Sequence, residues 1–288
     1  MSHGLYIPKA PPPSLIEKLQ AWSLVLPATA AFTHLTAAEL HGWWLPEAPP
    51  YPVFAAMRKA DPRPRRSGLY VCRHPKPFPM TITSDGIKIT TPAETLLASA
   101  RDLGILDVVI LADSALREGD VTLTQLKITA AQRRRGAPML RQVIPLLDQR
   151  SESAWESVMR VLHVVADIPV EPQYEIFDEF GRFVARVDLL IKGTRRIHEY
   201  DGGVHREVET HQKDLKRERT LILDNWQRLG FTSAHLRNDG AAIIRSIDAL
   251  LGRPWDSRRL QAWEELLNQS MFRRPGRARA LRHWSRAL

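Results

Sequence analysis

Hydrophobic residues in the second half of the chain recur with two different periods. Over residues 154–166 they are three and four positions apart, which predicts an amphipathic helix. Over residues 183–191 they occupy alternate positions, which predicts a strand with one buried face. Further strands are predicted over residues 173–178, 196–201 and 231–237, and further helices over residues 207–229 and 239–251.

The order of these elements is helix, three strands, helix, strand and helix. Short turns at residues 179–182 and 192–194 join the first three strands, so we expect an antiparallel meander. The long helix over residues 207–229 would then cross over and bring in the last strand. This half of the chain is therefore expected to be an α/β domain of the α+β type.

The first half of the chain predicts a mixed domain in which helices dominate over a small sheet. Its helices are expected over residues 15–26, 35–44, 92–103, 106–118 and 123–133, and its strands over residues 53–58, 68–73 and 87–90. Thr36 with Glu39 predicts one helix start, and Thr91-Pro92-Ala93-Glu94 predicts another. A change of composition at residues 148–151 predicts domains over 1–150 and 151–252, followed by a basic helical tail over 253–288.

The composition is that of a soluble globular protein, with 44% hydrophobic and 25% charged residues among 288. Cys72 is the single cysteine, which excludes a disulfide framework and a cysteine zinc site. No stretch approaches the roughly 20 apolar residues of a membrane helix, and the N-terminal residues do not resemble a signal peptide. We therefore expect a cytoplasmic protein that makes no membrane contact.

Basic residues are gathered in three places, although the net charge is only +9. Seven Lys and Arg face one acid between Tyr51 and Met80, Arg133 to Arg135 form a second cluster, and six Arg occur after Met271 with no acid among them. Such clusters suit a polyphosphate partner, or they form a solvated surface without a partner. If the partner is DNA, the candidates for phosphate contacts in these clusters are Arg65, Arg66, Arg134 and Arg274.

Two acidic residues lie on neighbouring strands of the expected meander. Asp188 interrupts the apolar strand 183–191, and Glu199 lies on the strand 196–201, so the two side chains can meet. A charge in an apolar strand is costly, and converging carboxylates repel each other. A bound Mg²⁺ or Mn²⁺ relieves both problems. The alternative is a structural ion pair of Asp188 with Arg186 or Arg196.

Asp201-Gly202-Gly203-Val204-His205 follows directly on these acids. Asp201 is either a third metal ligand or the cap of a turn. His205 is either a general acid or base, or a phosphate ligand, or a surface histidine at the start of a helix. On that helix, Arg217 is either a contact to the scissile phosphate or a partner in an ion pair within the helix.

Glu156 and Arg160 lie one turn apart on the helix predicted over residues 154–166. Ser153 and Glu156 have the spacing of a capping box, so Glu156 either closes the helix end or contributes to the acidic site. Arg160 either pairs with Glu156 or reaches phosphate. Together with Arg186 and Arg217, it completes the set of candidate DNA-binding arginines.

Five motifs in this half carry a family resemblance. They are Ser153-x-x-Glu156-x-x-x-Arg160, Gly181-Arg182-x-x-x-Arg186-Val187-Asp188-Leu189, His198-Glu199-Tyr200-Asp201-Gly202-x-x-His205, Asp214-x-x-Arg217, and Leu229-Gly230-Phe231 with Arg237. As a set they resemble restriction-endonuclease-like proteins common in actinobacteria. Those proteins are related to the very-short-patch repair endonucleases of the PD-(D/E)XK superfamily. The resemblance covers about residues 150–252.

This resemblance implies a core of helix, three-stranded meander, helix and strand. It implies that Asp188 is the metal-binding aspartate, that Glu199 is the second acid, and that Glu156 is the acid of the first helix. Asp201 stands where the superfamily usually has a lysine. The activation of the attacking water is then left to His205 or to the metal.

The first half carries a second resemblance, through Phe32-Thr33-His34-Leu35-Thr36-Ala37-Ala38-Glu39-Leu40-His41-Gly42 and through the run from Gly86 to Leu97. Both resemble the AbiEi family of antitoxins and transcriptional regulators. That family has a winged helix-turn-helix followed by an α/β domain. About 30 residues precede the first of these motifs.

Taken together, the sequence predicts an Mg²⁺- or Mn²⁺-dependent DNA endonuclease or nickase, acting in defence or in the repair of mismatched or modified DNA. The first alternative is a non-catalytic DNA-binding regulator or type IV antitoxin on a nuclease-like scaffold. The second is an RNA-processing enzyme. Many nucleases act as homodimers, but the sequence shows no dimer surface.

Overall fold

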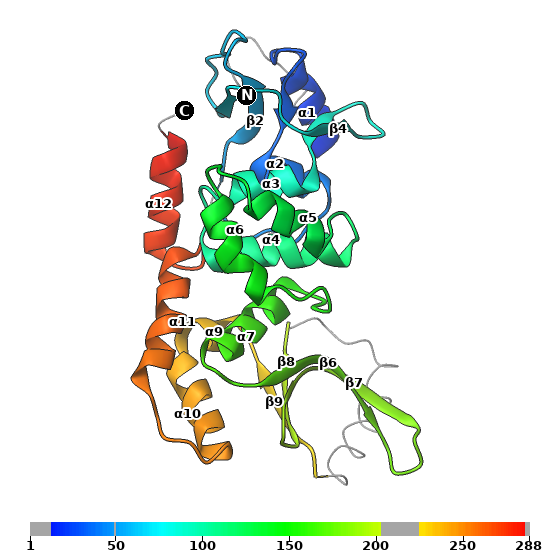
Figure 1. The fold of residues 1–288 in the computed structure, drawn as a ribbon, viewed down its shortest axis with the longest axis vertical. Coiled ribbons are helices and arrows are strands. Elements are labelled where there is room, and N and C mark those ends of the chain that lie inside the picture. Colours follow the sequence, from blue (N-terminus) through cyan, green and yellow to red (C-terminus); the bar gives the residue numbers. More distant parts are fainter. Residues whose placement is uncertain (1–12, 49, 203–224, 286–288) are drawn as a thin grey trace. The chain divides into compact units, whose positions relative to one another are not determined.

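The structure, a computed structural model, describes residues 13–48, 50–202 and 225–285 (Figure 1). These residues divide into two compact units. The first consists of the described residues up to Leu147 together with those from Asn268 onward, and the second runs from Asp148 to Leu267. Each unit combines helices with its own sheet, so the protein belongs to the α+β class, as expected. The residues expected to form one tail, 253–288, are divided between the two units.

The first unit contains a five-stranded mixed sheet in the order β3-β2-β1-β5-β4. Its strands are β1 (Ala31–Phe32), β2 (Val53–Arg58), β3 (Leu69–His74), β4 (Met80–Ile82) and β5 (Lys88–Thr90). β2 and β3 run parallel with Val53 opposite Leu69, whereas β1 is antiparallel to β2 and parallel to β5. The side chains of Phe32, Val53 and Leu69 pack with Trp22 of the first helix, so this helix and the sheet share one apolar core.

Helices cover the rest of the first unit. They are α1 (Leu15–Ser23), α2 (His34–Leu40), α3 (Pro92–Ser99), α4 (Ile105–Arg117), α5 (Leu123–Ala130), α6 (Ala137–Val143), the 3₁₀ turn η1 (Ile144–Leu146) and α12 (Arg274–Ser285). In Figure 1 helices α3 to α6 lie together, as their mutual contacts also show. α12 is joined to this unit by Trp284, which is 1% exposed and whose ring Nε1 donates to Asp102 at 3.2 Å.

The second unit contains a four-stranded sheet in the order β6-β7-β8-β9 (Figure 1). The strands are β6 (Val170–Phe177), β7 (Phe183–Ile191), β8 (Arg196–Tyr200) and β9 (Gln227–Phe231). The first three form an antiparallel meander, and β9 joins the edge of β8 in parallel. The antiparallel meander of the first three strands is the arrangement that the sequence predicts.

The helices of this unit are α7 (Ala154–Val165), α9 (Ser233–Asn238), α10 (Gly240–Leu250) and α11 (Ser257–Gln269), the last of which continues into the first unit. α7 and α9 both contact the sheet. Trp263 of α11 is fully buried against the start of α10. A Cβ at Gly240 would lie 2.7 Å from its ring, which is why the chain has glycine there.

Two expectations at the end of this sheet are wrong. The predicted strand over residues 231–237 is replaced by β9, four residues earlier, and by α9, whose N-cap is Thr232. Of the helix predicted over residues 207–229, the described part is a turn followed by β9. The remainder of that helix lies outside the described residues.

The first half also differs from expectation in detail. α2 begins at His34, and its N-cap is Thr33, three residues before the expected Thr36. Thr36 instead lies buried inside the helix, where its Oγ1 accepts a hydrogen bond from the backbone N–H of Phe54 at 2.9 Å. β1 and β4 were not predicted, because two or three paired residues carry too little pattern to be seen in sequence. The seven-residue helix α6 was not predicted either. No helix within residues 13–48, 50–202 and 225–285 is long and apolar enough to cross a membrane.

Candidate active site

The strands β7 and β8 pair over only a short distance. Leu190 pairs with Ile197 and Leu189 with His198, and the ladder then stops. One further step in the same register would place Asp188 directly across from Glu199. At this point a side chain links the two strands in place of a backbone carbonyl. Asp188 Oδ2 accepts a hydrogen bond from the backbone N–H of Tyr200 at 2.8 Å. Asp188 and Glu199 therefore occupy the first positions beyond the end of this ladder, one on each strand.

The ring of Tyr200 fixes the backbone that binds Asp188. It stacks on the indole of Trp155 from α7, with 5.9 Å between ring centres, and the guanidinium of Arg237 lies over the same indole at 5.4 Å. Such stacked groups hold an amphipathic ring in one orientation. The first turn of α7 and the last residues of α9 thus hold in place the N–H group that positions the Asp188 carboxylate.

Glu199 is buried, with 7% of its surface exposed, and it has a cationic partner. The Nε of Arg228 on β9 donates to Glu199 Oε2, and β9 brings these residues together because Ile197 and Arg228 are register partners. A buried carboxylate needs such a partner, since an unpaired charge in a protein interior is strongly unfavourable. Sequence reasoning missed Arg228, because it lay in the predicted helix rather than in a strand.

Gln173 lies on the other side of Asp188. Pro172 pairs with Leu189 and Tyr174 with Val187, so Gln173 of β6 occupies the position opposite Asp188. Its backbone has φ 52°, a left-handed conformation that is uncommon for glutamine. By strand position, Gln173, Asp188 and Glu199 therefore follow one another in a row across β6, β7 and β8. Sequence analysis did not single out Gln173, and a left-handed backbone at a non-glycine residue leaves no signal in a sequence.

Glu156 joins this row from α7. Its Oε2 accepts hydrogen bonds from the side chain of Gln173 at 2.9 Å and from the backbone N–H of Glu152 at 2.7 Å. Ser153 caps the helix by accepting from the backbone N–H of Glu156, but the Glu156 carboxylate accepts from the backbone N–H of Glu152 instead of that of Ser153. The reciprocal capping box is thus only half formed. Burial raises the pKa of Glu156 above its ordinary value.

The remaining acidic candidate, Asp201, follows β8. Its backbone N–H donates to the carbonyl of Phe231 at 2.8 Å, and its side chain is exposed. Among the residues that the structure describes, no three His, Cys, Asp or Glu side chains converge as a metal site. The expected set of Asp188, Glu199 and Asp201 is therefore not assembled. His205 and Arg217 lie outside the described residues.

A two-carboxylate site is nevertheless compatible with Mg²⁺. This cation is commonly held by one or two carboxylates, with water and substrate phosphate completing its octahedron. Asp188 and Glu199 supply such a pair of carboxylates. The charge of Glu199 is already neutralised by Arg228. The donor set fits a divalent cation that is bound partly by the chain and partly by a phosphodiester.

The candidate DNA-binding arginines have different surroundings in the structure. Arg160 is 4% exposed and its Nε lies 3.5 Å from Ser151 Oγ, so its burial argues against the phosphate contact that we expected. Arg134 is bound by both carboxylate oxygens of Glu94, so it too has a structural partner. Arg186 forms an exposed ion pair with Glu152 at 2.8 Å. Arg65 and Arg274 are exposed and Arg66 is half-buried.

One further contact in this unit involves two buried histidines. His163 Nδ1 lies 2.7 Å from the carbonyl of Met159 and His163 Nε2 lies 2.8 Å from His198 Nδ1. Since a carbonyl only accepts, His163 carries its proton on Nδ1 and accepts a hydrogen bond from His198. Burial lowers the pKa of His163 to about 4. The pair joins α7 to β8 in neutral form.

Comparison with known proteins gives relatives but no function. Two Mycobacterium tuberculosis proteins, from strains CDC 1551 and H37Rv, are each 28% identical to this chain over 239 residues. The match covers 80% of this chain and 82% of theirs, and each of them is described only as an uncharacterized protein. No protein-family model matches the chain, and no solved structure matches it.

Proposed function

We propose that this protein is a divalent-metal-dependent DNA endonuclease or nickase whose active centre lies in the second unit. One observation carries the proposal: the β7–β8 ladder ends at Leu189 and His198, and the next residue on each strand is an acid, Asp188 or Glu199. The family resemblance of the sequence supports it. DNA is the proposed partner, a homodimer remains compatible with cutting both strands, and defence or repair in the cytoplasm is the proposed setting.

Asp188 and Glu199 would hold Mg²⁺ or Mn²⁺, which supplies positive charge beside a phosphodiester. The hydrogen bond from Tyr200 orients Asp188 for this task. Arg228, whose side chain is 35% exposed, lies beside Glu199 and is placed to meet a phosphate there. In the hydrolysis, a water oxygen forms a bond to phosphorus, the phosphorus–oxygen bond to the sugar breaks, and the leaving oxygen takes up a proton.

The proton transfers are assigned within the same proposal. Asp201 stands where the resemblance leads one to expect lysine, so the base that receives the proton of water is assigned to His205. Glu156 is the candidate acid, because burial raises its pKa and Gln173 links it to the row that contains Asp188. Asp201, whose side chain is exposed, is then not assigned as a ligand of the metal.

Plasmid cleavage tests the proposal. Purified protein is incubated with supercoiled DNA, with and without Mg²⁺ or Mn²⁺, beside Asp188→Asn and Glu199→Gln. Glu175→Gln is the matched control, since Glu175 is an exposed acid on β6 of the same sheet. We expect metal-dependent nicking by the wild type and by the control, and its loss in the other two variants. DNA binding without cleavage of supercoiled, mismatched or modified DNA would refute the proposal.

A second candidate is a non-catalytic DNA-binding regulator or antitoxin. Two observations favour it: Glu199 is already paired with Arg228, and no three metal-binding side chains converge among the described residues. In that case both carboxylates are structural, and the substitutions in the plasmid assay would change stability without revealing any cleavage. The plasmid assay separates the two candidates, and cleavage of structured RNA alone would indicate the RNA-processing alternative.

A further inference from the structure

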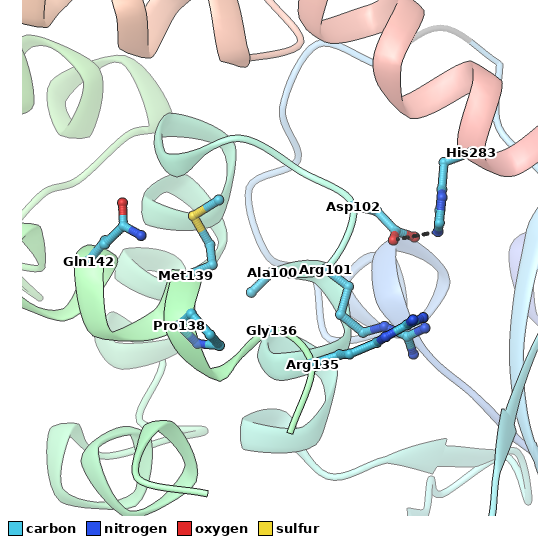
Figure 2. A pocket seen from close by; sticks show the side chains of 9 residues that line it. All are labelled: Ala100, Arg101, Asp102, Arg135, Gly136, Pro138, Met139, Gln142 and His283. Atoms are coloured by element: carbon cyan, nitrogen blue, oxygen red, sulfur yellow. Dashed lines mark ion pairs between the residues drawn. The ribbon is translucent and has the colours of Figure 1, made fainter. Parts of the chain in front are cut away.

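Two hollows of about 450 Å³ each lie in the first unit and share two arginines, Arg101 and Arg135. Figure 2 shows the first hollow, where Arg101 follows α3 and Arg135 precedes α6, and both side chains extend toward the same side. The second hollow continues past these arginines to Lys59 and Arg73, which follow β2 and belong to β3. Because both hollows are lined by Arg101 and Arg135, they form one continuous surface.

This surface collects basic residues that are far apart in the sequence. The second hollow is lined by Lys59, Arg73, His74, Arg101, Arg134 and Arg135. The acid that lines it, Glu94, is held by both guanidinium nitrogens of Arg134. These two charges neutralise each other, so the rest of the lining has excess positive charge.

Asp102, the acid that lines the first hollow, also has side-chain partners. Asp102 Oδ1 lies 3.1 Å from His283 Nε2 (Figure 2). Asp102 Oδ2 accepts a hydrogen bond from the indole of Trp284 at 3.2 Å. Arg101, by contrast, points one nitrogen at Cys72 Sγ, 3.6 Å away, and its Nε is buried without a hydrogen-bond partner among the described residues. Guanidinium groups that share a hollow repel each other unless an anion lies between them.

We propose that this surface binds phosphate groups of a nucleic-acid backbone, with Arg101 and Arg135 at its centre and Lys59 and Arg73 at its rim. Arginine recognises phosphate through paired N–H donors. Two connected hollows with cations along both offer places for more than one phosphate, which favours a polyanion over a single phosphate ion. The site is separate from the acids of the second unit and does not depend on cleavage.

The test is the affinity of the full-length protein for a fluorescently labelled DNA duplex, measured by anisotropy without divalent cation. Arg135→Glu is compared with Arg133→Glu, which makes the same change at an exposed arginine of the same loop outside both hollows. Lys59→Glu is compared in the same way with Lys76→Glu. Circular dichroism and melting curves establish that all four variants are folded.

We expect Arg135→Glu and Lys59→Glu each to weaken DNA binding by about tenfold or more. Each should also reduce the slope of log affinity against log salt concentration by about one. The two control variants should bind within about threefold of the wild type. Equal losses in variants and controls, or no loss in any, would overturn the proposal. So would binding of a nucleoside monophosphate that depends on Arg135 while duplex binding does not. A nuclease proposal that fails in the plasmid assay leaves this measurement unaffected.

Discussion

The carboxylate of Asp188 accepts a hydrogen bond from the backbone N–H of Tyr200, 2.8 Å away, at the place where β7 and β8 separate. A side chain has therefore replaced a backbone acceptor between two neighbouring strands. This bond ties the Asp188 carboxylate to the backbone just after Glu199, and the Tyr200–Trp155 stack holds that backbone in place.

Arg228→Gln should destabilise the second unit, because it leaves Glu199 buried without its cation. The expected loss is about 2 kcal/mol in the free energy of unfolding, below the full cost for a buried pair, since the Arg228 side chain is 35% exposed. Mn²⁺ should raise the melting temperature of this variant more than that of the wild type, because the cation then replaces the lost positive charge.

The matched control for Arg228→Gln is Lys192→Gln. Lys192 pairs with Glu171 at 2.8 Å on the same sheet, but Lys192 is exposed and Glu171 is only half-buried. This change should cost about 0.5 kcal/mol and leave the response to Mn²⁺ as it is in the wild type. If Mn²⁺ stabilises all three proteins equally, Glu199 is not a ligand.

His163→Gln should change the dependence of stability on pH. The pKa of His163 is about 4 in the folded protein, whereas an unfolded histidine titrates near 6.5. Between these values the unfolded chain binds a proton that the folded protein does not, so stability is complete above pH ~6.5 and falls as the pH is lowered toward 4. The variant should lose about one proton of uptake on unfolding near pH 5.

Chemical denaturation at a series of pH values measures this uptake. Glutamine is the substitution of choice because its side-chain oxygen can still accept the hydrogen bond from His198. The same slope of unfolding free energy against pH in the variant and the wild type would show that His163 is protonated in the folded state.

Arg134→Ala should destabilise the first unit, whereas Arg133→Ala should not. Arg134 holds Glu94, which is 4% exposed, so its loss should cost about 3 kcal/mol. Arg133 is exposed, and changes at such positions usually stay within about 0.5 kcal/mol. Equal melting temperatures for both variants would contradict a structural role for Arg134.

Strong periodic patterns made part of the fold predictable. The strand expected over residues 183–191 is β7, Phe183–Ile191, because every second residue from Phe183 to Ile191 is apolar. α7 begins at the residue that its apolar spacing and the N-cap Ser153 predict. These two elements position Asp188 and Glu156, so both could be found in the sequence.

The partners of these residues were not predictable in the same way. β9 is an edge strand whose residues are mostly exposed, so it lacks alternation, and Arg228 was hidden in an expected helix. The positive φ of Gln173 and the bond between Glu94 and Arg134, 40 residues apart, depend on tertiary structure rather than on local sequence. The sequence of three consecutive arginines does not reveal which of them forms an ion pair with a buried acid.

Binding of Mn²⁺ to the second unit's carboxylate pair tests the central proposal most directly, and the electron paramagnetic resonance signal of free Mn²⁺ measures it. The wild type and Glu175→Gln should take up Mn²⁺ with the same affinity, and Asp188→Asn and Glu199→Gln should each weaken it by about tenfold or more. Uptake that is absent in the wild type, or that is the same in all four proteins, would contradict the account.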